Sequence, residues 1–146
     1  MSFQPPASLV AGSESVWKDC FLLYRDYLSK SHYERLNAFC VYDVPWRKEL
    51  VSMFGKVHVA RRRTCCYGAP GAMYRYRGSA QTPLTWDGPL LQLRDRLESE
   101  LGASFNFVLL NRYRDGGDHV GFHSDDERDL QSEPVIASIS LGSSRT

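Results

Sequence analysis

The sequence predicts an α+β fold in which helices come first and short strands then close into a β-sandwich or jelly roll. Three observations lead to this prediction. A strong helical stripe ends at residue 102, an apolar run at 105–113 is typical of an interior strand, and residues 134–141 alternate as a strand does. The 146 residues, 42% of them apolar, suffice for one domain with a hydrophobic core.

The first third of the chain predicts a lead-in, a strand and a helix. Residues 1–15 are rich in Pro, Ser, Gly and Ala, and we expect them to be flexible. The apolar run Phe21–Tyr24 predicts a short strand. Ser31–Glu34 has the pattern of a capping box, so we expect a helix there that ends near Pro45. Its residues at helical spacing are Tyr33, Leu36 and Cys40.

The pattern changes from Ser52 onward. Residues 54–59 alternate around a glycine, which is typical of a bent ribbon, and three arginines follow at once. Residues 67–71 predict a turn, and Met73–Tyr76 an extended stretch beyond it.

The clearest helix begins at Asp87, which can cap it, with Pro89 in the first turn. Gly102 is typical of the residue that ends a helix. The apolar stripe between them predicts a core-facing surface without chemistry, and consists of Leu90, Leu93, Leu97 and Leu101. Beyond this helix we expect a strand at Phe105–Tyr113, a turn at Arg114–Asp118 and a last strand at 134–141.

Charge and cysteine usage constrain the class of protein. Lys and Arg total 18 and Asp and Glu 17, so the net charge of +1 argues neither for nor against a nucleic-acid partner. The four cysteines form no CxxC pair, and the adjacent Cys65 and Cys66 suit neither a disulfide nor a zinc framework, which predicts a reducing compartment. Without an apolar run of about 18 residues or a signal-peptide pattern, we expect a soluble intracellular protein that does not contact membranes.

His123 and Asp125 are candidate metal ligands. A histidine and a carboxylate two residues apart on an extended segment point to one side and can bind one ion. Two histidines and one carboxylate bind iron in non-haem Fe(II) oxygenases. No histidine follows His123 before the last residue, Thr146, so the sequence supplies two of these three ligands. The spacing alone leaves open a surface turn with an ion pair.

Asn111 and Tyr113 end an otherwise apolar face of the strand that precedes this pair. An amide and a phenol in such a place are either hydrogen-bonded core residues or ligand contacts. They could line the same pocket as His123.

A longer motif identifies a family. The chain carries Asn-x-Tyr at 111–113, an Arg-Asp-Gly turn at 114–116, His-x-Asp-Asp-Glu-Arg at 123–128 and Pro-Val-Ile-Ala-Ser-Ile-Ser at 134–140. In this order the motifs resemble the AlkB family of Fe(II)/2-oxoglutarate dioxygenases, and within it the animal DNA oxidative demethylases. The resemblance covers residues 50–146 well and 20–50 loosely.

The resemblance implies the double-stranded β-helix, or jelly roll, of the 2-oxoglutarate oxygenases, with helices at its N-terminus. Residues 16–146 would be the N-terminal two-thirds of such a domain, and 103–146 the first part of its jelly roll. The family continues past the position of Thr146 with strands that bear the second iron histidine and two arginines, one of which pairs with 2-oxoglutarate. We therefore expect a chain that lacks the C-terminal strands and has little or no dioxygenase turnover.

The resemblance also assigns roles to individual residues. His123 and Asp125 match the first two iron ligands, and Asn111 and Tyr113 match residues that contact 2-oxoglutarate. Residues 52–78 would form a DNA-contacting finger and a lid over the base. The residues that match contacts to the flipped base are Tyr74, Tyr76, Asp126 and Glu127; those that match the finger and its phosphate contacts are Met53, Phe54, Gly55, Lys56, Arg61, Arg62 and Arg63.

Each of these residues also has an ordinary structural interpretation. Phe54 could be a core aromatic, and the arginines a solvated face or a localisation signal. The two tyrosines could pack in the core of a strand, and Asp126 and Glu127 could form surface ion pairs with Arg128. Their joint order along the chain favours the functional interpretation.

The function that the resemblance implies is oxidative demethylation of 1-methyladenine and 3-methylcytosine in duplex DNA, with Fe(II), O2 and 2-oxoglutarate, by a nuclear monomer. The implied roles fit together physically. The damaged base is flipped out of the duplex, an apolar side chain fills the gap that the base leaves, and cationic side chains contact phosphates in any sequence. Two alternatives stay open. One is a DNA-binding fragment without catalysis, and the other is a paralogue that acts on single-stranded DNA or RNA.

Overall fold

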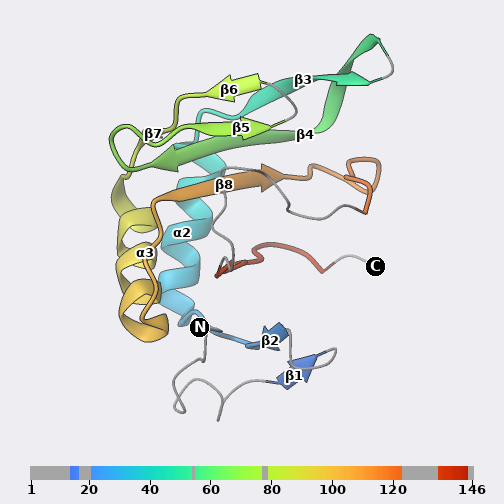
Figure 1. Cartoon of the computed structure of the whole chain (residues 1–146). Coiled ribbons are helices and arrows are strands. Elements are labelled where there is room, and N and C mark those ends of the chain that lie inside the picture. Colours follow the sequence, from blue (N-terminus) through green and yellow to red (C-terminus); the bar gives the residue numbers. More distant parts are fainter. Residues whose placement is uncertain (1–13, 17–20, 54, 77–78, 123–134, 145–146) are drawn as a thin grey trace. The chain divides into compact units, whose positions relative to one another are not determined.

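The computed structural model describes residues 14–16, 21–53, 55–76, 79–122 and 135–144 (Figure 1). In chain order the elements are β1 (Glu14–Val16), β2 (Phe21–Leu23), α2 (Lys30–Tyr42), β3 (Arg47–Met53), β4 (Lys56–Gly68), β5 (Tyr74–Tyr76), β6 (Ser79–Gln81), β7 (Leu84–Thr85), α3 (Gly88–Leu101) and β8 (Phe107–Arg112).

The chain divides into two units. One, which we call the helical unit, comprises residues 1–42, 87–105 and 133–142 and contains α2 and α3. The other, the sheet unit, comprises residues 43–86, 106–132 and 143–146 and contains β3 to β8. The described helices include none that is both long and apolar enough to span a membrane.

In the helical unit, α2 begins at Lys30, one residue before the predicted capping box at Ser31–Glu34. Its first turn is capped by Ser29, whose carbonyl accepts from the amide of Tyr33 at 2.9 Å and whose hydroxyl accepts from the amide of His32 at 3.4 Å. Leu36 and Phe39 are the buried residues of this helix. Of the other two residues predicted at helical spacing, Tyr33 is exposed and Cys40 is half-buried. The helix ends before Pro45, as predicted.

The predicted helix at 87–102 is confirmed as α3. Asp87 precedes it in an extended conformation, but its side chain makes no capping hydrogen bond; its carbonyl instead accepts from the amides of Leu90 and Leu91. Gly102 has a φ of 64°, and its amide donates to the carbonyl of Glu98. Within the predicted leucine stripe, Leu90 is buried and the other three leucines are half-buried.

A polar cluster ties the segment before α2 to the end of α3. The Tyr27 hydroxyl donates to Glu100 Oε2 at 2.6 Å, and Arg96 Nε donates to Glu100 Oε1 at 2.7 Å. The Arg96 guanidinium also lies 4.3 Å from the centre of the Tyr27 ring. Burial and the hydrogen bond to Glu100 raise the pKa of Tyr27. Burial by itself would raise the pKa of Glu100, but the hydrogen bonds from Arg96 and Tyr27 outweigh it and lower that pKa.

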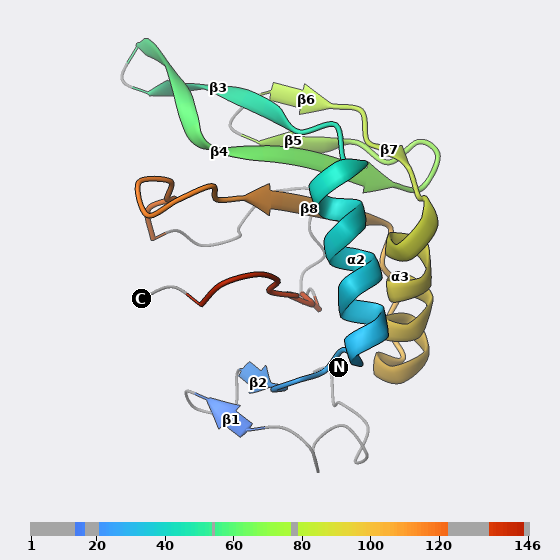
Figure 2. The same cartoon turned by 180° about the vertical axis from the view of Figure 1, so that it is seen from behind.

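In the sheet unit, β4 is the central strand (Figures 1 and 2). Its first part pairs with β3, its last two residues pair with β7, and residues 63–68 pair with β8 along the other edge. The pairing with β7 is parallel and the other two are antiparallel, so the sheet is mixed. Between Lys48 and Leu50 the register shifts, so that residues 60–62 of β4 lie opposite Glu49 alone.

The core of the sheet unit follows from this double pairing. Thr64, Cys65, Cys66 and Tyr67 of β4 are buried, together with Leu110 of β8. Burial raises the pKa of both thiols, so they stay protonated near neutral pH. Both cysteines are free.

The predicted order and the predicted jelly roll are not what the described residues show. Five strands lie between α2 and α3, so the helices do not simply precede the strands. The described strands form a small mixed sheet and two two-stranded ladders rather than a jelly roll. Whether strands close into a jelly roll depends on which strand edges pair with each other. The spacing of apolar residues along the sequence does not reveal these pairs.

The strand predicted at 134–141 is also wrong for the described residues. Residues 135–141 form no ladder with any described strand. Their alternation persists only in part in burial: Val135, Ile139 and Leu141 are half-buried and Ile136 is exposed, but Ala137, on the same side as Val135, is exposed as well. Alternation predicts the two sides of an extended segment, but a strand also requires a neighbour with free backbone groups. By contrast, the predicted strands at 21–24 and 105–113 are confirmed as β2 and β8.

Replacing Tyr27 with Phe should lower the free energy of unfolding by about 1 kcal/mol at pH 7, because it removes the hydrogen bond to Glu100 but keeps the ring. The raised pKa of Tyr27 contributes stability that is complete below the unfolded value of about 10 and is lost as the pH rises further. The variant should therefore lose less stability than the unmodified chain between about pH 9 and pH 11.

Urea unfolding at several pH values measures both effects. Tyr33→Phe, on the exposed side of α2, is the matched control and should match the unmodified chain. Equal losses for the two variants would contradict the role given to Tyr27.

Candidate nucleic-acid and metal site

The β3–β4 hairpin presents an exposed apolar face. It turns at Gly55, whose φ of 73° is the left-handed conformation that glycine adopts at little cost. In the register, Leu50 lies opposite Val59, and Val57 lies two residues further toward the turn on the same face. These three side chains are 66%, 57% and 69% exposed, respectively. The turn lies at the opposite end of β4 from β7 (Figure 1).

The three predicted phosphate-binding arginines do not share one face. Arg61 is exposed, Arg62 is only 6% exposed and Arg63 is half-buried. Consecutive residues of a strand point to opposite sides, so three adjacent arginines cannot all face one ligand. The phosphate contact of Arg62 stays a prediction, and the low exposure of this side chain counts against it. Arg61 donates from a terminal nitrogen to the carbonyl of Gly117 at 3.3 Å, which links β4 to the loop after β8.

A row of cations crosses the sheet. Arg63 lies opposite Lys48 on β3 and opposite Arg112 on β8, so the three side chains share one face. Like charges directly opposite one another are unfavourable. The Arg112 guanidinium lies 5.9 Å from the ring of Trp46, whereas Arg63 Nε is buried and has no hydrogen-bond partner within the described part of the chain. Sequence reasoning missed this row, because it depends on the register of three strands.

The two residues predicted to contact 2-oxoglutarate lie at the open end of β8. Asn111 is exposed and lies opposite the buried Thr64 of β4. Tyr113 follows the strand by one residue and is 36% exposed. Alternation puts the two side chains on the same side of the extended chain, where an amide and a phenol can both donate hydrogen bonds to a carboxylate.

Asp118 closes the loop after β8. The sequence predicts this residue only as the end of a turn. Asp118 is 3% exposed and accepts from the Arg114 guanidinium at 2.7 Å through each of its two oxygens, and from the Arg114 amide at 3.0 Å. These bonds raise the pKa of Arg114. Asp115 Oδ1 accepts from the amide of Gly117 at 2.8 Å, which tightens the same turn. The spacing of an arginine and an aspartate four residues apart could have indicated this pair.

The predicted base-contacting tyrosines belong to β5. Tyr74 lies opposite Gln81 and Tyr76 opposite Ser79 in the antiparallel pair of β5 and β6. The extended conformation predicted for this segment is confirmed. Met53 ends β3 opposite Lys56, the first residue of β4, which is exposed.

The remaining predicted site residues, including both iron ligands, lie outside the described residues; they are Phe54, His123, Asp125, Asp126 and Glu127. Across the ranges that the structure describes, no three His, Cys, Asp or Glu residues are grouped so that they could hold a metal ion. The donor set of His123 and Asp125, an imidazole nitrogen and a carboxylate oxygen, is of the type that suits Fe(II).

The likeness to known proteins decides the family. Residues 21–146 match the 2OG-Fe(II) oxygenase superfamily. The chain belongs to this superfamily. The resemblance found in the sequence motifs is therefore confirmed, and the family is one whose members use Fe(II) and 2-oxoglutarate.

Three curated relatives show where in the superfamily the similarity is strong. The chain is 46% identical over 95 residues to the DNA oxidative demethylase ALKBH2 of Mus musculus, which is 65% of this chain and 40% of that protein. It is 44% identical over 95 residues to ALKBH2 of Homo sapiens, covering 65% of this chain and 36% of that protein. It is 37% identical over 105 residues to the human alpha-ketoglutarate-dependent dioxygenase alkB homolog 3, covering 71% of this chain and 36% of that protein. The chain thus spans well under half the length of these relatives.

Replacing Asp118 with Asn should loosen the loop between β8 and His123. An amide has one accepting oxygen where the carboxylate has two, so the bidentate contact with Arg114 cannot form. The Arg114 amide should exchange its hydrogen about tenfold faster. Hydrogen exchange read by mass spectrometry over residues 113–118 measures this.

Asp115→Asn is the matched control in the same loop. Its amide oxygen can still accept from Gly117, so exchange of the Arg114 amide should change little. Equal acceleration in both variants would show that Asp118 has no special part in closing the loop.

Proposed function

We propose that this chain supplies the first metal ligands and the DNA-contacting hairpin of an AlkB-type DNA oxidative demethylase. The observation that carries the proposal is the superfamily match over residues 21–146, joined to 46% identity with a relative named for DNA demethylation. The proposed substrates are 1-methyladenine and 3-methylcytosine in duplex DNA, which places the site of action in the nucleus. The proposed active form is a monomer.

Residues 52–78 act as a finger and a base-binding lid in this proposal. A base inside a duplex is out of reach, and flipping it costs about a few kcal/mol, less when methylation has already broken its pairing. An apolar wedge offsets part of that cost by filling the gap in the stack. The exposed apolar face of the β3–β4 hairpin supports this role, and Phe54 at its turn, between Met53 and Gly55, is the proposed wedge.

Cationic side chains near the hairpin hold the DNA backbone. Among the residues predicted to contact phosphates, Lys56 and Arg61 are exposed and are the proposed contacts, while the buried Arg62 supports the strand instead. Arg63 joins Lys48 and Arg112 in the row across the sheet, where a phosphate would relieve the repulsion of three like charges.

The flipped base is held by aromatic and acidic residues. Tyr74 and Tyr76 are two residues apart on β5, so both can face one ligand, and stacking of a base on an aromatic ring contributes roughly 1–3 kcal/mol. Asp126 and Glu127 are proposed to accept hydrogen bonds from the exocyclic nitrogen of the base, with Asp126 as the nearer of the two.

His123 and Asp125 are proposed to hold Fe(II), and Asn111 and Tyr113 to orient 2-oxoglutarate beside it. When bound, Fe(II) would supply the chemistry by which O2 oxidises both the N-methyl group, which would be lost as formaldehyde, and 2-oxoglutarate, which would yield succinate and CO2. Asn111 and Tyr113 contribute hydrogen bonds that fix the co-substrate. The closed turn at Arg114–Asp118 sets the direction in which the chain leaves β8 toward His123.

A second candidate function is DNA binding without catalysis. The exposed hairpin and the cation row both favour it, because neither requires iron. Turnover separates the two functions, since binding alone releases no succinate.

His123→Ala should abolish the low iron-dependent succinate release that is expected of the 146-residue chain supplied with Fe(II), 2-oxoglutarate and a duplex that contains 1-methyladenine. Loss of a direct ligand should exceed the roughly 10–100-fold that loss of a neighbouring support costs. His119→Ala removes an exposed imidazole four residues away and is the matched control. Duplex binding by the unmodified chain without any succinate release would favour the non-catalytic function.

Phe54→Ala should weaken demethylation of duplex DNA by about tenfold and leave a methylated single strand nearly unaffected, because only a duplex has a gap to fill. Quantifying methylated and restored bases by mass spectrometry on matched duplex and single-stranded oligonucleotides measures this. Val41→Ala is the control, since it trims an exposed aliphatic side chain of α2, outside the hairpin. Equal losses on both substrates would point to a protein that acts on single strands.

A further inference from the structure

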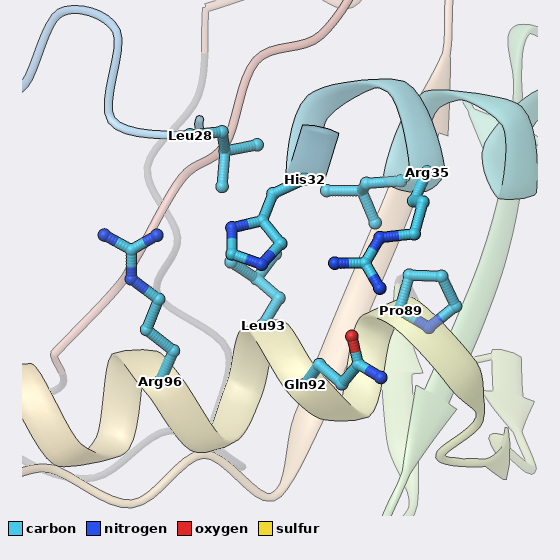
Figure 3. A pocket seen from close by; sticks show the side chains of 8 residues that line it. Leu28, His32, Arg35, Pro89, Gln92, Leu93 and Arg96 are labelled. Carbon is cyan, nitrogen blue, oxygen red and sulfur yellow. The ribbon is translucent and has the colours of Figure 1, made fainter. Parts of the chain in front are cut away.

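A cavity of about 40 Å³ lies between α2 and α3, wholly within the helical unit (Figure 3). The proposed function uses none of its residues. Its floor is aliphatic, and it is formed by Leu28, Leu36, Pro89 and Leu93. We call this cavity, with the polar side chains at its rim, the interhelical groove.

The rim of the interhelical groove is basic. His32 and Arg35 come from α2, and Gln92 and Arg96 from α3. Figure 3 shows the Arg35 and Gln92 side chains pointing toward each other from the two helices, with the His32 ring above Leu93. None of the described residues that line the groove is acidic.

The positive charges of the rim are not equivalent. Arg96 is bound to Glu100 at 2.7 Å and lies over the Tyr27 ring, so its charge is already balanced. Arg35 is exposed, and within the described part of the chain its guanidinium has no hydrogen-bond or ion-pair partner. The uncompensated charge of the groove therefore comes from Arg35.

His32 adds a polar group in a fixed orientation. Its Nδ1 lies 3.1 Å from the hydroxyl of Ser29, the residue that caps α2. This contact fixes the ring above Leu93 (Figure 3), and Nε2 takes no part in it. His32 and Arg35 both line the groove, so one ligand with hydrogen-bonding oxygens can contact both side chains.

The mixture of an aliphatic floor and a cationic rim selects among possible ligands. A nucleic acid would offer phosphates to the rim, but its bases stack on aromatic rings, and among the described residues that line the groove only His32 carries one. A free inorganic anion would leave the aliphatic floor unused. A peptide that carries a carboxylate beside an aliphatic side chain matches both parts.

We propose that the interhelical groove docks an acidic segment of a partner protein, with a carboxylate on Arg35 and an aliphatic side chain over Leu36 and Leu93. The cavity admits the tip of one such side chain, which makes the segment short. None of the residues of the groove is among the proposed iron or DNA residues, so the docking does not depend on the oxygenase chemistry.

Fluorescence anisotropy with the 146-residue chain and a dye-labelled peptide of sequence EELEE at low salt tests the proposal. Arg35→Glu should weaken binding at least about tenfold, as expected for loss of a charge-assisted hydrogen bond. Lys30→Glu is the matched control on the same helix, with the same change of charge on a side chain that is 90% exposed and outside the groove. It should change the affinity less than about twofold.

A second variant and two further peptides make the test independent of one substitution. Gln92→Glu places a carboxylate from α3 opposite Arg35, and it should weaken binding to a similar extent without altering α2. The peptides QQLQQ and EEGEE remove the charge and the aliphatic anchor in turn, and both should bind more weakly than EELEE. Circular dichroism confirms that each variant is folded.

Four results would overturn the proposal. The first is no binding of EELEE up to about 1 mM, and the second is an equal loss of affinity for Arg35→Glu and Lys30→Glu. The third is that QQLQQ binds as tightly as EELEE. The fourth is displacement of EELEE by inorganic phosphate or by a thymidine dodecanucleotide, with the same sensitivity to Arg35→Glu. The last result would identify a phosphate-binding surface instead.

Discussion

The backbone pairing of β4 on both of its edges is the constraint on which the rest of the sheet unit depends. Residues 63–68 of β4 pair with β8 along one edge. Along the other edge, residues 63 and 64 pair with β3, and residues 67 and 68 pair with β7. This stretch is the most buried part of the strand. The first residues of the same strand pair with β3 alone among the described strands, and their side chains are exposed. One strand therefore joins a rigid base, beside Asn111, to an exposed hairpin that is proposed to meet DNA.

The distribution of charge follows from the same strand. Alternation sends Arg62 into a buried position and leaves Arg61 outside, where it contacts the loop at Gly117. Pairing on both edges then brings Arg63 between two other cations. A sheet tolerates such a row more easily when a ligand of opposite charge is bound, because like charges opposite one another are unfavourable. This cost to the free protein is a physical reason to expect an anion on this face.

Local sequence signals predicted the elements more reliably than their arrangement. The helix from Asp87 to Gly102 was predicted because leucine spacing, a proline in the first turn and a terminal glycine all act within a few residues. The boundaries of α2 were less accurate, since Ser29 rather than Ser31 caps the helix and both offer the same hydroxyl. The prediction of a strand at 134–141 was wrong because alternation depends only on neighbouring residues, whereas a strand needs a pairing partner from elsewhere in the chain. For the site, motif spacing named Asn111 and Tyr113, but the burial of Asp118 and the row through Arg63 depend on contacts between distant segments.

The sequence by itself determined the superfamily, the two helices, the turn after β8 and the residue types available for iron, co-substrate and DNA. These follow from short-range spacing and from motifs whose order along the chain is distinctive. Tertiary structure alone decided which arginine is buried, which cations share a face, how Arg114 and Asp118 close the loop, and that two helices leave a basic groove between them. The physical reason is that burial, register and charge balance are properties of surfaces brought together by folding, and no residue carries them until its neighbours are in place.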